Sequence, residues 1–322
     1  PRPIRAKFVG GSSVTAAPGA LDCRRFPVLY AGPQGAHMPE AIAEPWDIGR
    51  DVAGFVWRTP GAHANVLLAH GFAEYSGRYV RHYSALIPRL NSCGFDVYAF
   101  DLKGHGHSTG ARGVVDLKAA VRDHQAARRL LDAQKRPLFL FGHSLGGLVT
   151  AASVTGEPSG VAGVILSAPA LLIQAPPHLR ALAGVFAAIA PGLRLAPPIE
   201  AASLSRIPEE VAAYTSDPMV SDPRVPAKTG ATAIAVAEAA WKRYPDWSAP
   251  TLVLHGEKDR ATDSQGSKRF IAAIRSADKH LELYPEGLHE LLNDLDQKAA
   301  LALILSWLAE RAPVRAGARA TG

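Results

Sequence analysis

The chain has 322 residues, 48% of them hydrophobic and 20% charged, a composition typical of a globular protein and not of a disordered or fibrous one. Its two cysteines, Cys23 and Cys93, are too few for a disulfide framework or a zinc site of four thiolates, so we expect free thiols. The net charge of +6 comes from the ends, with +4 in residues 1–37 and +3 in residues 311–322, so residues 38–310 are nearly neutral and predict no nucleic-acid partner.

From about residue 50, short aliphatic runs alternate with longer stretches of helical periodicity. The expected strands, in chain order, are 64–70, 96–101, 137–142, 161–168, 250–255 and 280–284. The expected helices are 78–91, 116–134, 145–154, 263–274 and 296–311. The strands are almost continuously apolar, which is typical of a sheet covered by helices on both faces. This alternation predicts an α/β fold with a mostly parallel central sheet.

The alternation stops between residues 170 and 248, where the chain is rich in Ala and Pro and has no strand pattern. Because this stretch is too long for a simple connection, we interpret 170–248 as an inserted, mainly helical cap. The cap divides the α/β core into two parts, 50–169 and 249–311. We expect residues 1–49 to form a partly disordered N-terminal extension and residues 312–322 to form a flexible tail.

The N-terminal residues include basic side chains but no apolar stretch of the kind found in a secretory signal. The longest uncharged run, 158–177, has prolines near its end, which is typical of a strand and loop and not of a membrane-spanning helix. We therefore predict a cytoplasmic location and leave open a peripheral association with membranes.

The strongest chemical signal is the Gly-x-Ser-x-Gly pattern of Gly142–Gly146, which lies between an expected strand and an expected helix. In such an elbow the serine lies at a strained turn, and small residues two positions before and after it let the strand and helix approach. The amide of Leu145, at the N-terminus of the helix, would point toward a developing oxyanion. We predict Ser144 as a nucleophile; the alternative is a glycine-rich turn with a capping serine.

A serine nucleophile needs a base and a carboxylate that orients the base, expected in the chain order Ser, Asp or Glu, His. Of the two histidines after the last expected strands, His289 lies in a loop at the carboxyl end of a strand, where reacting groups collect. We predict His289 as the base and His280 as a rim residue. Asp259 directly follows a strand and is favoured as the acid over Glu257 and over Asp263, which is placed to cap a helix.

A second oxyanion donor is expected from the loop that follows an early strand, where Phe72 comes after His70 and Gly71. We predict the Phe72 amide as this donor and a structural hydrogen bond within the loop for His70. The glycine- and histidine-rich segment 104–110 lacks the Lys-Ser/Thr end of a phosphate-binding loop, and two histidines at i and i+2 do not make a metal site. We interpret 104–110 as a supporting turn and predict neither a metal nor a cofactor.

Five ordered segments together resemble the monoacylglycerol lipase and lysophospholipase-like branch of the α/β-hydrolases: 70–79, 100–113, 141–148, 255–263 and 286–290. The resemblance covers about residues 50–310. It implies Ser144 as nucleophile, Asp259 as acid and His289 as base, with oxyanion donors at Phe72 and Leu145. It also implies the α/β-hydrolase fold and hydrolysis of long- or medium-chain fatty esters under a mobile cap, without a cofactor.

The chain departs from the usual motif of that family in its first segment. Ala73 and Tyr75 stand where the family commonly has a second glycine and a histidine. If the loop requires a positive φ at position 73, an alanine there costs about 1 kcal/mol. We therefore expect a difference in the shape of the pocket more than in its chemistry.

The expected function is hydrolysis of lipid esters, either monoacylglycerols or lysophospholipid-like esters. The alternatives are a short-chain carboxylesterase, an iminopeptidase-type hydrolase and a non-catalytic hydrolase-like binding protein; a dehalogenase would need Asp at position 144. In the cap, Leu182 and Phe186 belong to a stretch that is apolar nearly all round. They are candidate contacts for the acyl chain, and this part of the cap is a candidate contact with a lipid surface.

Overall fold

A computed structural model describes residues 42–173, 176–194 and 197–312. Within these residues, eight strands form one sheet in the order β1-β2-β4-β3-β5-β6-β7-β8. The strands are β1 (Glu44–Pro45), β2 (Gly54–Trp57), β3 (Ala64–Ala69), β4 (Phe95–Phe100), β5 (Leu138–His143), β6 (Gly163–Ser167), β7 (Thr251–Gly256) and β8 (Lys279–Tyr284). The pairs β1–β2 and β2–β4 are antiparallel and all others are parallel, which confirms the mostly parallel sheet.

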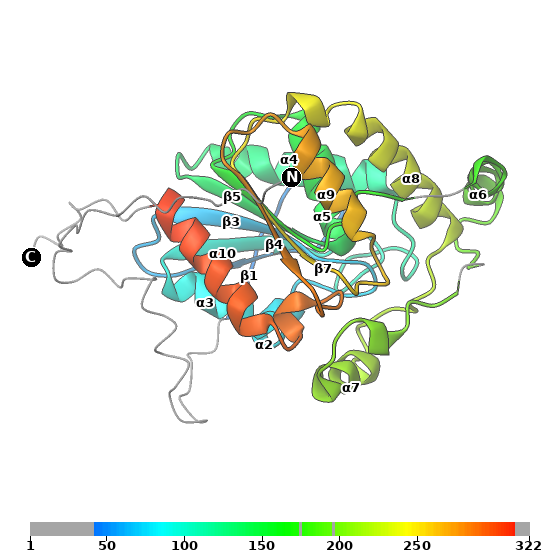
Figure 1. Ribbon diagram of the computed structural model, residues 1–322, viewed down its shortest axis with the longest axis horizontal. Helices are drawn as coiled ribbons and strands as arrows, with labels where there is room; N and C mark the ends of the chain where they lie inside the picture. The colour runs from blue at the N-terminus through cyan, green and yellow to red at the C-terminus, as the bar shows by residue number, and fades with distance from the viewer. Residues whose placement is uncertain (1–41, 174–175, 195–196, 313–322) are drawn as a thin grey trace, which may run out of the picture.

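Helices cover both faces of this sheet, as its apolar strands predicted. The α-helices described are α2 (Arg78–Arg81), α3 (Leu86–Ser92), α4 (Leu117–Asp132), α5 (Ser144–Gly156), α6 (Pro177–Ile189), α7 (Pro208–Ser216), α8 (Ala227–Trp241), α9 (Ser264–Ala273) and α10 (Gln297–Arg311). One core cluster joins the sheet to α4, α5, α8 and α9, and a second joins it to α2, α3 and α10. Figure 1 shows α4, α5 and α9 above the sheet and α2, α3 and α10 below it.

The helix expected over 78–91 is broken in the structure. Residues 83–85 form a 3₁₀ turn with left-handed φ angles between 52° and 57°, which separates α2 from α3. The hydroxyl of Ser84 donates to the carbonyl of Leu292, 2.8 Å away, so a contact with a distant segment holds this turn. Pro88 also favours a new start, because proline fits the first turn of a helix but not its interior. Helical periodicity alone does not reveal such a tertiary contact.

The body begins earlier than the sequence indicated, which corrects the N-terminal extension assigned to residues 1–49. β1 pairs with β2, an antiparallel strand that was not expected. Ile48 is buried, and the Trp46 ring lies edge-on to Tyr98 with the ring centroids 4.8 Å apart. These apolar contacts attach residues 44–48 to the sheet. The remainder of the extension, residues 1–41, and residues 313–322 of the expected tail lie outside the described residues.

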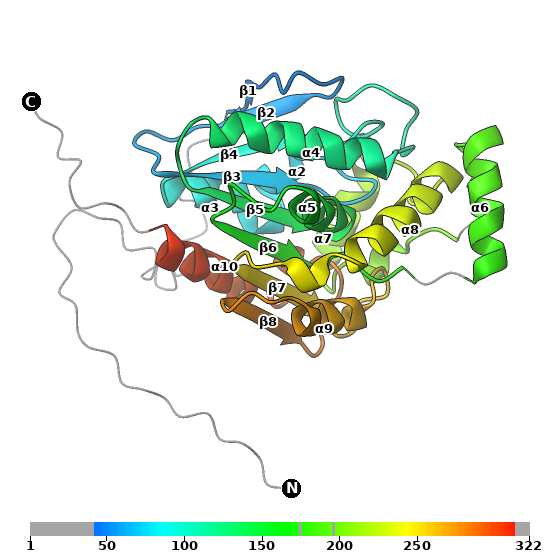
Figure 2. The same ribbon diagram turned by 90° about the horizontal axis from the view of Figure 1, so that it is seen from above.

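Between β6 and β7, the described part of the chain contains α6, α7 and α8 with two 3₁₀ turns, η3 (Ala201–Ser203) and η4 (Tyr244–Asp246), and no strand. α8 packs against α4 and α5 of the core, and α6 packs on α8 (Figure 2). α6 is thus the outermost helix of the segment 170–248. Among the helices described, none combines the length and the apolar composition needed to cross a bilayer.

Candidate active site

Ser144 lies at the junction of β5 and α5, with a left-handed φ of 53°. Two glycines make this turn possible. A Cβ at Gly142 would lie 2.6 Å from the Thr150 hydroxyl, and one at Gly146 would lie 2.2 Å from the Ala69 carbonyl oxygen. The Gly-x-Ser-x-Gly pattern therefore reflects close packing of β5, α5 and β3, and it lifts a strained serine to the carboxyl end of the sheet.

The structure brings Asp259 and His289 together from two neighbouring strand ends. Asp259 lies in the loop after β7, residues 257–263, which we call the acid loop, and His289 lies in the loop after β8. The His289 Nδ1 is 2.7 Å from the Asp259 Oδ2, and both side chains are almost completely buried. Because Nδ1–H donates to the carboxylate, the lone pair of the neutral ring lies on Nε2, as a general base requires.

The other candidate carboxylates and the other histidine lie apart from this pair. Asp263 caps α9, where its Oδ1 accepts from the Gln265 amide at 2.9 Å. Glu257 forms an exposed ion pair with Lys268, and His280 lies at 3.0 Å from Glu282 on the exposed edge strand β8. These three side chains bind partners at the surface or at the start of a helix, and none of them lines the cavity beside Ser144.

The charges of the pair reinforce one another. Burial would raise the pKa of Asp259, but the charge of His289 and hydrogen bonds from His255 and His289 hold this pKa below its ordinary value of 3.8. Burial would lower the pKa of His289, but the Asp259 carboxylate raises it above 6.5, and Glu290 and Glu74 raise it further. The arrangement therefore favours an ionised acid and stabilises an imidazolium next to it.

The predicted oxyanion loop, residues 70–77 and called the oxyanion loop below, is held by hydrogen bonds to buried groups of the core. His70 accepts the Leu102 amide on Nε2 at 2.9 Å, and its Nδ1 lies 2.8 Å from the Gly71 carbonyl, the structural role that the sequence predicted. Ala73 has a φ of 68°, so it takes the conformation that a glycine would prefer. The Ala73 amide donates to Nε2 of His105 at 3.0 Å, a hydrogen bond that helps to offset the strain.

The segment 104–110 supports this loop, because His105 accepts from Ala73 as a neutral ring. Burial, and the nearby His70, lower the pKa of His105 to about 3, so its Nε2 keeps the lone pair that the amide needs. Phe72 precedes Ala73 in the loop. The Leu145 amide belongs to the first turn of α5, where N–H groups have no partner inside the helix. Both predicted donors therefore belong to segments that flank Ser144.

A narrow cavity of about 20 Å³ lies at these residues, with room for about one water molecule. Core residues and cap residues share its wall. The core contributes Gly71, Phe72, Glu74, His143, Ser144, His289 and Glu290, and the cap contributes Ile199, Leu204 and Tyr214. Since this space is too small for an acyl chain, the cap segment around 199–214 closes the site in this conformation.

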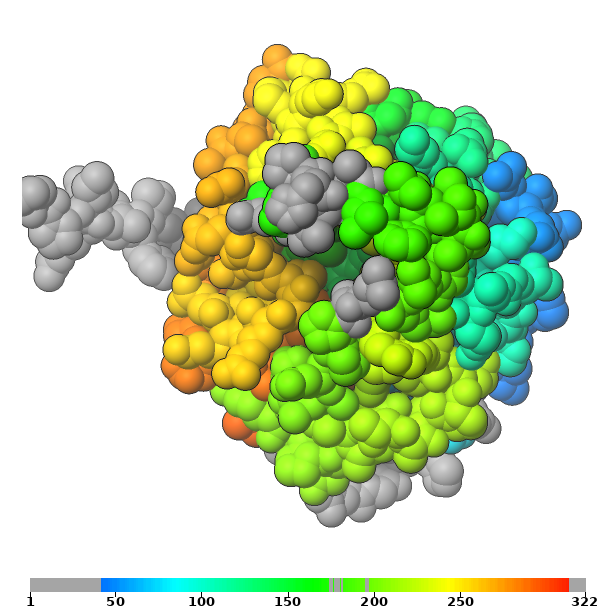
Figure 3. Space-filling model, turned by 90° about the vertical axis from the view of Figure 1, so that its right-hand side faces the viewer, coloured from blue at the N-terminus to red at the C-terminus, as the bar shows by residue number. Residues whose placement is uncertain are grey.

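A wider, open groove of about 420 Å³ runs beside the acid loop and is lined by residues 170, 172, 173 and 259–263. Figure 3 shows this face of the molecule hollowed between the acid loop side (orange-yellow) and the cap (green). Leu182 and Phe186 line neither of these two spaces. Leu182 is 46% exposed on α6, so the structure does not bring these two predicted substrate contacts to Ser144.

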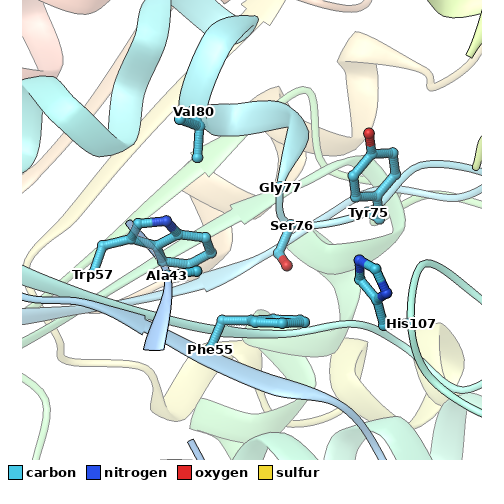
Figure 4. A pocket seen from close by; sticks show the side chains of 8 residues that line it. All are labelled: Ala43, Phe55, Trp57, Tyr75, Ser76, Gly77, Val80 and His107. Atoms are coloured by element: carbon cyan, nitrogen blue, oxygen red, sulfur yellow. The ribbon is translucent and has the colours of Figure 1, made fainter. Parts of the chain in front are cut away.

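A separate pocket of about 180 Å³ lies behind the oxyanion loop, between β2 and α2 (Figure 4). The aromatic side chains of Trp57, Phe55 and Tyr75 lie around it, together with small residues, Val80 and His107. The Tyr75 hydroxyl donates to Asp217 at 3.0 Å, so the residue that departs from the usual motif connects the oxyanion loop to the end of α7. None of the predicted catalytic side chains lines this pocket.

Sequence reasoning missed several residues around the site. The cap residues Ile199, Leu204 and Tyr214 have no motif that would mark them. A signal existed for Glu74 and Glu290, because both lie inside the segments that carry the resemblance, at 70–79 and 286–290. Within the described residues, no group of three or more His, Cys, Asp or Glu side chains has the arrangement of a metal site.

Comparisons with known proteins agree with this fold. Residues 60–296 match the family model described as serine aminopeptidase, S33. The chain is 37% identical over 248 residues to the monoacylglycerol lipase of Mycolicibacterium smegmatis, covering 76% of this chain and 87% of that protein. It is 32% identical over 274 residues to the monoglyceride lipase of Rattus norvegicus, covering 82% of this chain and 88% of that protein.

Among solved structures, the monoacylglycerol lipase of Paleococcus ferrophilus is similar with a TM-score of 0.73 and 35% identity, covering 81% of this chain and all of that one. The monoglyceride lipase of Saccharomyces cerevisiae in complex with a substrate analog has the same TM-score at 22% identity, covering 88% of this chain and 99% of that one. The chain therefore belongs to the serine aminopeptidase S33 family, resembles its monoacylglycerol lipases in sequence, and is an ester-cleaving hydrolase with the α/β-hydrolase fold.

Proposed function

We propose that this enzyme hydrolyses monoacylglycerols or similar lipid esters through an acyl-enzyme on Ser144. The hydroxyl of Ser144 attacks the ester carbonyl while Nε2 of His289 takes its proton, and Asp259 holds the ring and stabilises the imidazolium. The amides of Phe72 and Leu145 bind the oxyanion. His289 then returns the proton to the leaving alcohol, and a water that it activates releases the fatty acid.

The observation that carries this proposal is the 2.7 Å hydrogen bond between Asp259 and His289, beside a cavity that contains a strained Ser144. The wall of that cavity is mixed. Leu204 and Ile199 are apolar, whereas Tyr214 and Glu290 are polar. The polar part of this wall suits an alcohol with free hydroxyl groups, which a monoacylglycerol has and a triacylglycerol lacks.

The names of the relatives, monoacylglycerol and monoglyceride lipases, support the same substrate class. We propose that the segment 170–248 acts as a movable cap, because the closed cavity is too small for an acyl chain. In α6, the side chains of Leu182, Val185 and Ile189 are 46%, 56% and 72% exposed. An exposed apolar stripe of this kind favours peripheral contact with a lipid surface. With the predicted cytoplasmic location, this would be the cytoplasmic face of a membrane.

The experiment that tests the proposal combines a probe and a substrate series. A fluorophosphonate should label the wild type at Ser144, and hydrolysis of monoacylglycerols should rise with acyl-chain length and then level off. Failure of the probe to react would favour a non-catalytic binding protein. A preference for acetate esters over longer chains would favour a short-chain carboxylesterase.

The description of the family model names an aminopeptidase, which is a second candidate function. An aminopeptidase would need an acidic group to bind the free amino terminus of its substrate. Glu74 and Glu290 reach the cavity, but they already flank the buried guanidinium of Arg78 at 3.4 and 3.7 Å. Glu74 also accepts from the Gly71 amide and from the Tyr79 hydroxyl. Since both carboxylates are engaged, we expect no hydrolysis of aminoacyl anilides under conditions where monoacylglycerols are cleaved.

A further inference from the structure

A second buried histidine, His255, contacts the acid of the site. It lies near the end of β7, four residues before Asp259, and its side chain is completely buried. Its Nε2 is 3.2 Å from the Asp259 Oδ2, the oxygen that also receives His289. Its Nδ1 is 2.7 Å from the Ser267 hydroxyl on α9. The Asp259 carboxylate is thus shared by two imidazole rings.

The surroundings of His255 fix which nitrogen carries the proton. Nε2 faces the Asp259 carboxylate and, at 3.3 Å each, the carbonyl and the hydroxyl of Thr262, and the carboxylate and the carbonyl can only accept. An ionised carboxylate cannot donate, so Nε2 must carry the hydrogen. Nδ1 then carries the lone pair, and the Ser267 hydroxyl donates to it. Ser267 therefore sets the tautomer that lets His255 donate toward Asp259.

The hydroxyl of Thr262 does not replace this donor. It lies 2.7 Å from the Asp259 Oδ2 and 3.0 Å from the Ala168 carbonyl, but it has only one proton to donate. The amides of Ala261 and Thr262 bind the other oxygen, Oδ1, at 2.7 and 3.0 Å. The Thr262 hydroxyl also lies 3.3 Å from the His255 Nε2, where its oxygen can accept, so His255 remains a second side-chain donor toward Oδ2.

We propose that His255 is a positioning residue of the hydrolytic site, a second imidazole donor that fixes the Asp259 carboxylate so that Oδ2 meets His289. This inference rests on the proposed function of Ser144, Asp259 and His289. The contact should act in two ways. It orients the carboxylate, and it withdraws negative charge from Oδ2, which tempers the attraction of Asp259 for the His289 imidazolium.

The other charged and titratable groups around His289 stay in place when only His255 is replaced. His143, at the end of β5, has its ring centroid 4.8 Å from that of His289, and burial and the charge of His289 lower its pKa to about 3. Glu74 of the oxyanion loop and Glu290 of the next position also act on His289. Within the described residues, none of these three side chains forms a hydrogen bond or ion pair with His255, so a change at His255 reaches His289 through Asp259 and its neighbour Thr262.

The first experiment replaces His255 with leucine and measures the fluorophosphonate labelling rate and ester turnover against pH. We expect kcat to fall roughly 10- to 100-fold with KM nearly unchanged, the range typical of residues that orient a reacting group through another. The acid limb of the labelling rate should move to higher pH, because a less neutralised carboxylate holds the His289 proton more tightly. In His255→Gln the side-chain amide can donate from about the same place, so most of the wild-type kcat and the wild-type position of the acid limb should return.

The chain offers a matched control in His124. It is also completely buried, and its Nδ1 lies 2.9 Å from a serine hydroxyl, that of Ser153, but it lies between α4 and α5 away from Asp259. His124→Leu should lower the melting temperature without moving the acid limb. If folded His255→Leu behaves like His124→Leu, with the wild-type kcat and acid limb, the proposal is wrong.

A second pair of variants decides the question if His255→Leu does not fold. Ser267→Ala removes the donor to Nδ1, so the proton can move to that nitrogen and leave a lone pair facing Asp259. It should slow labelling and move the acid limb, whereas Ser153→Ala should not; equal behaviour of the two would overturn the proposal. Loss of labelling in Ser144→Ala separates this test from the proposed function, because active Ser144→Ala would refute the nucleophile whatever His255 does.

Discussion

The acid loop and helix α6 differ in how firmly the rest of the protein holds them. The Asp259 carboxylate is completely buried and receives donors from two amides of its own loop and from His289. α6 exposes Val185 and Ile189, and an exposed ion pair connects its Arg180 to Glu238 of α8. A surface ion pair contributes at most about 1 kcal/mol. Several hydrogen bonds thus hold the reacting groups in place. The helix that we expect to contact lipid is attached mainly by packing.

The cap is not uniformly loose, because residues 204–206 attach it to the loop that carries His289. The Leu204 carbonyl accepts the Glu290 amide at 2.8 Å. Arg206 binds the buried carboxylate of Asp294 with both its amide and its side chain. Any opening of the cap should therefore keep 204–206 as a fixed point and move the wall residues on either side of it, Ile199 and Tyr214, together with α6.

The largest effect is expected at the nucleophile. Ser144→Ala should lower turnover by about six orders of magnitude with the fold unchanged, since the remaining rate comes only from binding and the oxyanion donors. Circular dichroism checks the fold, and ester turnover with a purified sample gives the rate. Retention of a tenth of the activity would exclude Ser144 as the nucleophile.

Next in size is the acid. Asp259→Asn should cost about 10³- to 10⁴-fold, because an amide can donate to Nδ1 and stabilise the wrong tautomer of His289. Asp263→Asn is the matched control four residues away, where the side chain caps α9 and the loss should be about 1 kcal/mol of stability at most. Steady-state kinetics and thermal melts of both variants test the assignment, which would have to be reversed if their effects were exchanged.

A smaller, graded effect is expected from pH. His289 must be neutral to act as a base, and the structure raises its pKa above the ordinary 6.5. The activity should therefore fall as the pH decreases through a midpoint above 6.5, by about tenfold for each unit below it. The pH profile of kcat/KM gives the midpoint, with the fold checked at each pH. A midpoint below 6.5 would mean that burial, and not Asp259, dominates the pKa.

This difference between the two regions also explains what the sequence could predict. The elbow around Ser144 and the loop positions of Asp259 and His289 follow from strands and short motifs, which are local. The break at residues 83–85 depends on Leu292, 208 positions away. The strand pairing of residues 44–45 and the tautomer of His255 depend on nearer partners, β2 and Ser267 of α9, that no local pattern marks. The cap has no motif, so its apolar pattern predicted a helix but not the face that this helix presents.

The smallest effects, confined to some substrates, are expected in α6. Phe186 is partly buried on this helix, whereas Val185 beside it is 56% exposed. If α6 moves over the site during turnover, Phe186→Asp should reduce the hydrolysis of dissolved medium-chain esters by about tenfold, equivalent to losing the burial of about two methylenes. Val185→Asp should leave this reaction unchanged and weaken turnover of monoacylglycerols presented in vesicles, since a charge opposes contact with a lipid surface.

Two measurements make this last prediction decisive. We expect a two-carbon ester to reach Ser144 without contact with α6, so its hydrolysis should survive both substitutions, and circular dichroism should find both variants folded. Flotation of the proteins with vesicles measures the lipid contact independently of turnover. Equal losses on short and medium chains would mean that Phe186 only supports the fold, and vesicle binding unaffected by Val185→Asp would place the lipid contact elsewhere. The first result would exclude α6 from binding the acyl chain, and the second would exclude it from binding the lipid surface. With both, residues 199–214, some of which line the cavity at Ser144, would be left as the part of the cap that selects the substrate.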